Sequence, residues 1–394
     1  MPDAFNPPST EPTENLVEYL FGGYSNWDAK HFLHISKYGY TFEHSAAFFP
    51  LYPITIRSLV DFLNRNSIQI DSPHLLCAIF LNFIYFIITV VFLFKLTNIL
   101  FNNNKLISLF TVLIFCINPA NVFFNAAYSE SLYTALTYSA LYFLYKYKNQ
   151  HNGVHLLIGL MLFFLSGLTR SNGLINFGYV GYIYLKIYFS KVKLKNSDAK
   201  IGNILSKAIN VWGILNSLLH LIRILLSLVF IAGSFLMYQY YIYLKFCDLV
   251  DIQSKMPKKL IKYANQNNYK FINDLNLQQL EWCNKTLPFS YGDIQSKYWG
   301  VGFMSYWQIK QIPNFLLAAP IFAISFHSLK AYFKSLSWNN FFNLLGLVDI
   351  NHDNSTMYKQ FHKNQNLFPF ALHLIFLLVS SSFFMHIQVR LSIT

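Results

Sequence analysis

The sequence predicts an all-α membrane protein in which several helices cross the bilayer as a bundle. Of its 394 residues, 54% are hydrophobic and only 12% are charged, about half the fraction of roughly 25% charged residues usual in soluble domains. Aromatic residues make up 19% of the chain, which is typical of lipid-facing surfaces and interfacial belts. The mean hydropathy of +0.33 agrees with this class.

Eight apolar segments are candidates for membrane spans, because a spanning helix needs about 20 mostly apolar residues. They are residues 75–100, 106–124, 132–145, 154–168, 174–189, 224–246, 312–326 and 368–385. Residues 208–223 mix apolar with polar and basic side chains, which favours an interfacial helix leading into the sixth span. Within the second of these segments, Pro119 is expected to start a helix at Ala120.

Lysine residues set the expected orientation, because they concentrate in alternate gaps between the spans. By the positive-inside rule these gaps are cytosolic. The lumenal side then holds residues 17–74, 118–131, 169–173, 247–311 and 386–394. The net charge of +13 is thereby explained by topology and anionic lipid headgroups. No nucleic-acid-binding motif is present, so nucleic acid is not an expected partner.

Four parts follow from this pattern. Residues 1–74 form an N-terminal segment and the first lumenal, catalytic loop, 75–246 a transmembrane bundle with short loops, 247–311 a long lumenal loop, and 312–394 the C-terminal membrane helices with a cytosolic linker at 346–364. Cys247 and Cys283 share the long loop, where an oxidising lumen would permit a disulfide. Asn284 opens a glycosylation sequon in the same loop, and its use would confirm the lumenal placement.

Asp28 is the candidate catalytic residue. It follows Trp27 in a polar, aromatic segment that stands before the first span, and an acid at the rim of a lipid-embedded bundle is a candidate functional group. Inverting glycosyl transfer needs one carboxylate to take the proton of the attacking hydroxyl, and the indole of Trp27 offers a face to a sugar ring. The alternative is a carboxylate that caps a helix beginning near Ala29.

Two other groups in this first loop are candidates for substrate contacts. Glu43 is the reserve candidate for the base, and its alternative role is an ion pair with Lys37 or Arg57. His31 is a candidate partner for a substrate hydroxyl. His31 and His34 lack a cysteine or an acid at metal-ligand spacing, so no metal site is predicted.

A polar group interrupts the apolar sequence at residues 128–131, Tyr-Ser-Glu-Ser. Such a group needs partners, because burying it alone in hydrocarbon costs several kcal/mol. Substrate hydroxyls are one set of partners for Tyr128 and Glu130. The alternative for Glu130 is a structural ion pair with Arg170, which is worth little by itself.

Residues 169–173, Thr-Arg-Ser-Asn-Gly, separate two spans. A guanidinium beside hydroxyls and amides suits a phosphate, which Arg170 can bind in bidentate fashion with Asn172 nearby. The alternative for Arg170 is to snorkel toward lipid headgroups. In the long loop, Gln295 and Trp299 belong to a mixture of amides and aromatics that matches carbohydrate recognition, and equally an ordinary aromatic belt.

These motifs resemble those of the PIG-V family of GPI-anchor mannosyltransferases, which add the second mannose. The matching stretches follow the family's order and cover most of the chain. They begin at Trp27-Asp28, Asn118-Pro119, Thr169-Arg170, Gln239-Tyr240, Gln295-Ser296 and Met385-His386.

The resemblance implies a multi-pass enzyme of the endoplasmic-reticulum membrane with the GT-C fold class, whose lumenal loops form the active site. The implied donor is dolichyl-phosphate mannose, and the implied acceptor is mannosyl-glucosaminyl-phosphatidylinositol, joined by an α-1,6 bond. GT-C enzymes keep a catalytic acid in the first lumenal loop, which maps onto Asp28, and no cofactor is expected. Membrane lipids and a small membrane subunit complete the implied partners.

The chain departs from the family pattern at both ends. It begins inside the first lumenal loop and stops soon after Met385-His386-Ile387-Gln388-Val389, so we expect it to lack the family's first and last membrane helices. The alternatives are another dolichyl-phosphate-mannose-dependent mannosyltransferase and a truncated, non-catalytic membrane subunit. A transporter is disfavoured, because the polar residues gather at one rim and no acid falls in the middle of a span.

Overall fold

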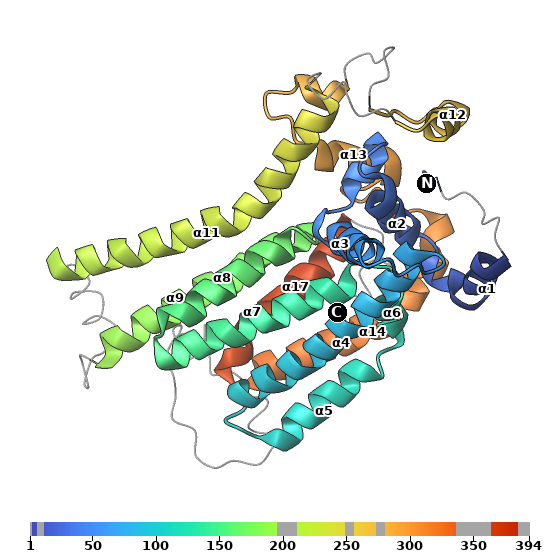
Figure 1. The fold of residues 1–394 in the computed structure, drawn as a ribbon. Coiled ribbons are helices and arrows are strands. Elements are labelled where there is room, and N and C mark those ends of the chain that lie inside the picture. The colour runs from blue at the N-terminus through green and yellow to red at the C-terminus, as the bar shows by residue number, and fades with distance from the viewer. Residues whose placement is uncertain are drawn as a thin grey trace.

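The computed structural model describes residues 2–5, 12–194, 211–248, 256–272, 280–335 and 364–384. These residues are helical or irregular, and their one β-pairing is an isolated antiparallel bridge between Phe42 and Phe271. Long helices lie side by side as a bundle, while the N-terminal helices gather with α12 and α13 at one end (Figure 1). The predicted all-α bundle of a membrane protein is confirmed.

Five helices make the centre of the bundle. They are α4 (Pro73–Leu100), α7 (Glu130–Gln150), α8 (Gly153–Gly167), α9 (Phe177–Leu194) and α11 (Val211–Phe246). Helix α7 packs between α4 and α8, and α11 packs against α8 and α9. Among the described residues, three helices are long and apolar enough to cross a membrane, Pro73–Leu100, Ile214–Phe246 and Ile309–Lys334.

The span predicted over residues 106–124 is formed by a bent pair of helices rather than by one straight helix. Helix α5 (Lys105–Cys116) is followed by a short turn, η3 (Pro119–Asn121), which leads into α6 (Val122–Asn125). The segment from Pro119 to Asn125 is bent by 63° from α5. The break has a local cause, because Pro119 lacks an N–H to continue the helix and the side chain of Asn118 caps Ala120 N at 2.9 Å. The helix start expected at Pro119 is confirmed.

Residues 208–223 were expected to form an interfacial helix leading into the sixth span, and the described part of this segment runs into that span without a break, as part of α11. Asn216, His220 and Arg223 follow one another at intervals of four and three residues. That spacing places them on one face of a continuous helix, so they do not require a break before residue 224.

The remaining elements complete the two ends and the far side of the bundle. They are α1 (Pro12–Phe21), η1 (Gly22–Ser25), α2 (Asp28–Tyr38), η2 (Glu43–Ala47), α3 (Leu51–Arg65), η4 (Ser171–Asn176), α12 (Lys258–Gln266), η6 (Glu281–Asn284), α13 (Ser290–Trp299), η7 (Ile309–Gln311), α14 (Ile312–Ser335), η8 (Gln365–Leu367) and α17 (Phe368–Phe383). The linker at 346–364, apart from Asn364, and the motif from Met385 lie outside the described residues.

One end of the bundle, which we call the site end, brings together loops that are far apart in sequence. Ala127 N donates to Tyr24 O at 3.0 Å and Leu51 N donates to Leu168 O at 3.0 Å. Tyr238 of α11 donates through its hydroxyl to the Phe48 carbonyl at 2.8 Å. The predicted lumenal segments within the described residues therefore meet at this end.

The opposite end, which we call the lysine end, is held by two asparagines of the turn before α17. Lys148 and Lys186 both donate to Asn366 Oδ1, at 3.0 and 2.9 Å. Asn364 Nδ2 donates to the carbonyl of Leu100 at 2.6 Å. Lys148 and Lys186, two of the lysines that set the predicted orientation, thus lie away from the site end.

Candidate active site

Asp28 is the first residue of α2 rather than its cap. The cap position is Trp27, whose φ of 52° lies in the left-handed region and whose side chain makes no capping bond. The alternative role of Asp28 as a helix cap is therefore wrong. Its carboxylate is half-buried and stands at a helix N-terminus, where the dipole favours negative charge. The Trp27 indole is 76% exposed.

The surroundings of Asp28 shift the pKa of its carboxyl toward neutral pH. The pKa of Asp28 is raised from 3.8 to about 6, mainly by burial and also by the charge of Glu130, while the charge of Arg170 acts in the opposite direction. Burial also raises the pKa of Tyr128, to which the charges of Asp28 and Glu130 add, so its hydroxyl stays a neutral donor. We call Asp28, Tyr128, Glu130 and Arg170 the Asp28 cluster.

Glu130 and Arg170 form the buried ion pair that was the structural alternative. Arg170 Nη1 lies 2.6 Å from Glu130 Oε1 and 3.2 Å from the hydroxyl of Ser129. Glu130 is 4% exposed, and its second oxygen, Oε2, is buried with no hydrogen-bond partner among the described residues. Because buried polar atoms are nearly always paired, Oε2 is an acceptor suited to a substrate hydroxyl.

Asn82, in the middle of α4, positions the loop that carries Tyr128 and Glu130. Its amide nitrogen donates to the carbonyls of Ala126 and, at 3.1 Å, Tyr128. The Tyr128 hydroxyl in turn donates to Asn26 O at 3.3 Å, next to the segment that carries Asp28. Sequence reasoning missed Asn82, although a lone amide inside an apolar helix must find a partner and was a usable signal.

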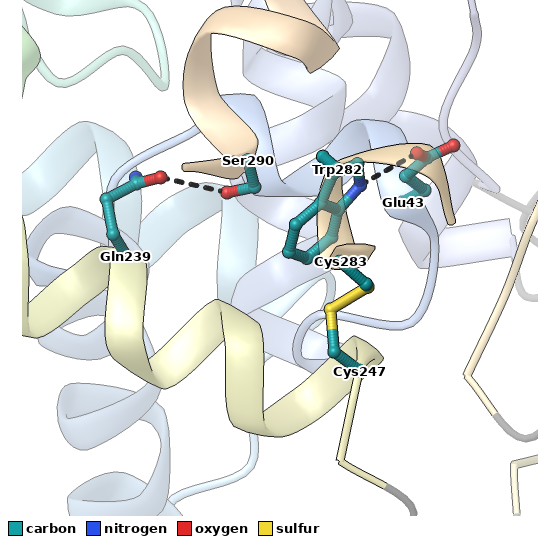
Figure 2. The surroundings of a disulfide bond; sticks show 6 residues. All are labelled: Glu43, Gln239, Cys247, Trp282, Cys283 and Ser290. Carbon is teal, nitrogen blue, oxygen red and sulfur yellow. Dashed lines mark hydrogen bonds between the residues drawn. A yellow bond between two sulfur atoms is a disulfide. The ribbon is translucent and has the colours of Figure 1, made fainter. Parts of the chain in front are cut away.

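Helix α13 adds a hydroxyl beside Arg170 that the sequence did not indicate. The Tyr291 hydroxyl lies 2.9 Å from Ser171 Oγ, and its position is fixed by Gln239 of α11. Gln239 Oε1 accepts from Ser290 Oγ at 3.0 Å (Figure 2) and from the Tyr291 amide at 3.1 Å. The side chain of one helix thus caps the N-terminus of another, because that terminus has unsatisfied amides.

Glu43 lies in a second cluster, the Glu43 cluster, with Trp282, Lys297 and Tyr298. Its carboxylate is 1% exposed and accepts from Trp282 Nε1 at 3.1 Å, from Lys297 Nζ at 2.8 Å and from the Tyr298 hydroxyl. The expected alternative partners were wrong: the carboxylate pairs with Lys297, while the Arg57 guanidinium donates to backbone carbonyls of the α2 C-terminus.

A disulfide between Cys247 and Cys283 anchors this cluster to α11, with 5.7 Å between the Cα atoms. Cys283 follows Trp282 in the short turn η6, so the bond fixes the indole that contacts Glu43 (Figure 2). The possibility of a disulfide in the long loop is therefore confirmed.

His31 lies one turn after Asp28 but faces an aromatic group. Its ring stacks on Phe48 with centroids 4.5 Å apart and meets the edge of Trp299 at 6.1 Å. Burial lowers the pKa of His31 to about 4, so the ring is neutral at pH 7. Within the described ranges, no group of three His, Cys, Asp or Glu residues is placed to hold a metal ion.

The predicted site residues therefore divide between two neighbouring settings. Asp28, Tyr128, Glu130 and Arg170 share one cluster, and Asn172 is buried in η4 two residues beyond Arg170. The others lie around α13: Glu43, His31, Gln295 and Trp299. Trp27 borders the first cluster by sequence, with its indole exposed.

Known proteins with similar sequences match nearly the whole chain. Residues 2–394 match the family described as Mannosyltransferase (PIG-V). The chain is 32% identical to "GPI alpha-1,6-mannosyltransferase 2" from Homo sapiens, over 98% of this chain and 74% of that protein. It is 31% identical to "GPI mannosyltransferase 2" from Drosophila melanogaster, over 98% of this chain and 80% of that one. No solved structure matches the chain significantly.

Proposed function

The chain belongs to the PIG-V mannosyltransferase family, and from this premise we propose that it adds the second, α-1,6-linked mannose to the GPI-anchor precursor. The family makes it a glycosyltransferase of the membrane. The observation that carries the proposal is the Asp28 cluster, in which a carboxylate with a raised pKa lies beside a buried Glu130–Arg170 pair.

Asp28 is the proposed general base. The acceptor's 6-hydroxyl attacks the anomeric carbon of mannose from the face opposite the phosphate, and Asp28 takes the hydroxyl proton as the bond forms. The carbon–oxygen bond to dolichyl phosphate breaks, and the phosphate leaves with the electron pair. A pKa of about 6 supports this role, because a base works best when its pKa is near the working pH.

Arg170 is the proposed contact for the donor phosphate. The ion pair and the hydrogen bond described for its guanidinium both use Nη1, which leaves Nε and Nη2 to meet phosphate oxygens in bidentate fashion. The Ser171 and Tyr291 hydroxyls lie 2.9 Å apart, so one donates to the other and the proton of the second is an additional donor beside Arg170. Asn172, in the same turn, is proposed to support this phosphate contact.

The sugar rings are proposed to lie between the two clusters. Glu130 Oε2 offers an acceptor to a mannose hydroxyl, and the Tyr128 oxygen, whose proton is donated to Asn26 O, can accept from another. Trp27 and Trp299 offer aromatic faces, and His31 and Gln295 flank them. Glu43 is proposed to act through α13, because its carboxylate is already engaged by three protein donors.

The proposed setting is the endoplasmic-reticulum membrane, with several spans and the site end in the lumen. The Cys247–Cys283 disulfide supports an oxidising compartment for that end, and the lysine end supports a cytosolic opposite face. The proposed partners are dolichyl-phosphate mannose, mannosyl-glucosaminyl-phosphatidylinositol, the surrounding lipids and a small membrane subunit.

Complementation tests the proposed function. Cells that lack the second GPI mannosyltransferase would receive the wild-type chain, the Asp28→Asn variant or an empty vector, with surface GPI-anchored protein as the readout. We expect rescue by the wild-type chain only, at matched expression. Rescue by Asp28→Asn at wild-type efficiency would contradict the role of Asp28, and a well-expressed wild-type chain that fails to rescue would contradict the proposed acceptor.

A further inference from the structure

Two N-glycosylation sequons occur in the chain, and they offer a comparison built into the molecule. They are Asn284-Lys285-Thr286 and Asn354-Ser355-Thr356, and no other Asn-x-Ser/Thr sequence is present. An oligosaccharide is attached to such an asparagine only in a secretory compartment. The side of the membrane on which each sequon lies therefore decides whether it is used.

Asn284 projects from the site end. It is the last residue of η6, directly after Cys283, which is bonded to Cys247 at the end of α11. One residue earlier, Trp282 donates to Glu43 at 3.1 Å. All three sequon residues are exposed, so the turn is anchored by its neighbours while the acceptor amide faces outward.

The described residues on either side of the second sequon lie at the lysine end. Asn354 itself lies outside the described residues, but both flanks are described. Near the end of α14, the Tyr332 hydroxyl donates to Asn364 O at 3.2 Å. Asn364 Nδ2 donates to Leu100 O at 2.6 Å, so the two flanks meet at the end opposite to Asn284.

We propose that Asn284 carries an N-linked glycan and that the sequon at Asn354 stays unmodified, an inference that rests on the proposed lumenal placement of the site end. The donor is a lipid-pyrophosphate-linked oligosaccharide. The bond between its anomeric carbon and pyrophosphate breaks, a bond from that carbon to Asn284 Nδ2 forms, and the amide loses one proton as the lipid pyrophosphate leaves.

The turn around Asn284 is held by contacts of its neighbours. Lys285 N donates to Trp282 O at 3.4 Å and Lys285 Nζ pairs with Asp293 at 2.6 Å, while the backbone of Lys285, at the centre of the sequon, is extended. The preceding Cys283 is fixed by the disulfide.

The test is the mobility of the full chain, expressed in cells and treated or not with peptide-N-glycosidase F. We expect a single shift in the wild-type chain, in Asn354→Gln and in Thr286→Ser, and none in Asn284→Gln or Thr286→Ala. Thr286→Ser and Thr286→Ala form a matched pair, because both shorten the side chain and only the first keeps the hydroxyl that the sequon requires.

Two results would overturn the proposal, and they separate it from the proposed function. A wild-type chain with no shift that still rescues GPI synthesis would overturn the glycan alone. A shift lost in Asn354→Gln and kept in Asn284→Gln would show that the chain has the opposite orientation in the membrane, and would contradict the lumenal reaction as well. Asn284→Gln is expected to rescue as well as the wild-type chain, because the residue lies outside both clusters.

Discussion

Two clusters of acidic residues at the same end of the bundle have different surroundings. Glu43 is almost fully buried, and three protein groups donate to it. In the Asp28 cluster, Asp28 has a raised pKa and one oxygen of Glu130 is buried without a hydrogen-bond partner among the described residues. The protein itself supplies the hydrogen bonds of the Glu43 carboxylate, whereas the Asp28 cluster has a hydrogen-bond acceptor left for a ligand.

This difference indicates that Glu43 has a structural role and that Asp28 has a chemical one. Satisfied buried polar networks rigidify a fold, and the Glu43 cluster joins the first loop to α13 and, through Trp282, to the disulfide. Perturbed ionisable groups concentrate at functional sites, which favours the Asp28 cluster for chemistry. The comparison predicts that mutations in the two clusters change different quantities.

The largest effect on stability is expected for Arg170→Met, because it leaves the Glu130 carboxylate buried and unpaired. Breaking a buried ion pair from one side costs about 3–5 kcal/mol. Thermal unfolding of the purified protein in detergent measures it. The double variant Glu130→Gln/Arg170→Met should recover most of the loss, and a double variant as unstable as Arg170→Met would show that the pair is not the cause.

Glu43→Gln is expected to lower stability by about 1.5–3 kcal/mol, the usual contribution of a hydrogen bond to a charged group. The Lys297 side chain is 46% exposed, so its loss of a partner adds little. The same unfolding experiment measures the change. Lys297→Met is the matched control: it leaves the Glu43 carboxylate buried with two neutral donors and no cation, so we expect a loss at least as large as that of Glu43→Gln, and a clearly smaller loss would contradict burial of the charge as the dominant cost.

Asp28→Asn is expected to raise stability slightly at neutral pH, the opposite sign to Glu43→Gln. Folding holds the pKa of Asp28 at about 6 instead of 3.8, so the ionised folded form is disfavoured by at most roughly 3 kcal/mol, which solvent screening at this half-buried group reduces to about 1 kcal/mol. The gain should disappear below about pH 4, where the wild-type carboxyl is protonated in both states. A loss of stability at pH 7 would contradict burial as the cause.

The pH dependence of the transfer rate sharpens the comparison further. Since the base must be ionised, the rate should fall about tenfold for each pH unit below the Asp28 pKa of about 6. Glu43→Gln should keep the same pH profile. Initial rates in membranes between pH 4.5 and 8 measure it, and a profile that stays flat to pH 4.5 would rule out a titrating base of this kind.

The fold was largely predictable because apolar length and lysine position depend on local sequence. The bend between α5 and α6 and the continuity of α11 were missed, since both depend on how a few polar residues are satisfied in three dimensions. Asn118 caps a new turn, whereas the polar residues of α11 follow one helical face. A hydropathy pattern does not distinguish these two outcomes.

The candidate site was predictable as a set of residue types but not as two clusters. Asp28, Glu130 and Arg170 stood out because charges are rare in this chain. Glu43 was the reserve candidate for the base, and its contacts with Trp282, Lys297 and Tyr298, about 240 to 255 positions away, distinguish it from Asp28. Asn82 and Tyr291 were missed because their roles depend on partners in other helices.

The most direct test of the difference between the clusters is mannosyl transfer per folded molecule. Purified wild-type, Asp28→Asn and Glu43→Gln proteins would be normalised to the folded fraction and supplied with dolichyl-phosphate mannose and the singly mannosylated acceptor. A lost general base costs about 10²–10⁴-fold, so we predict that drop for Asp28→Asn and a rate within a fewfold of wild type for Glu43→Gln. The reverse order, with Glu43→Gln inactive and Asp28→Asn active, would contradict the assignment of Asp28 as the base.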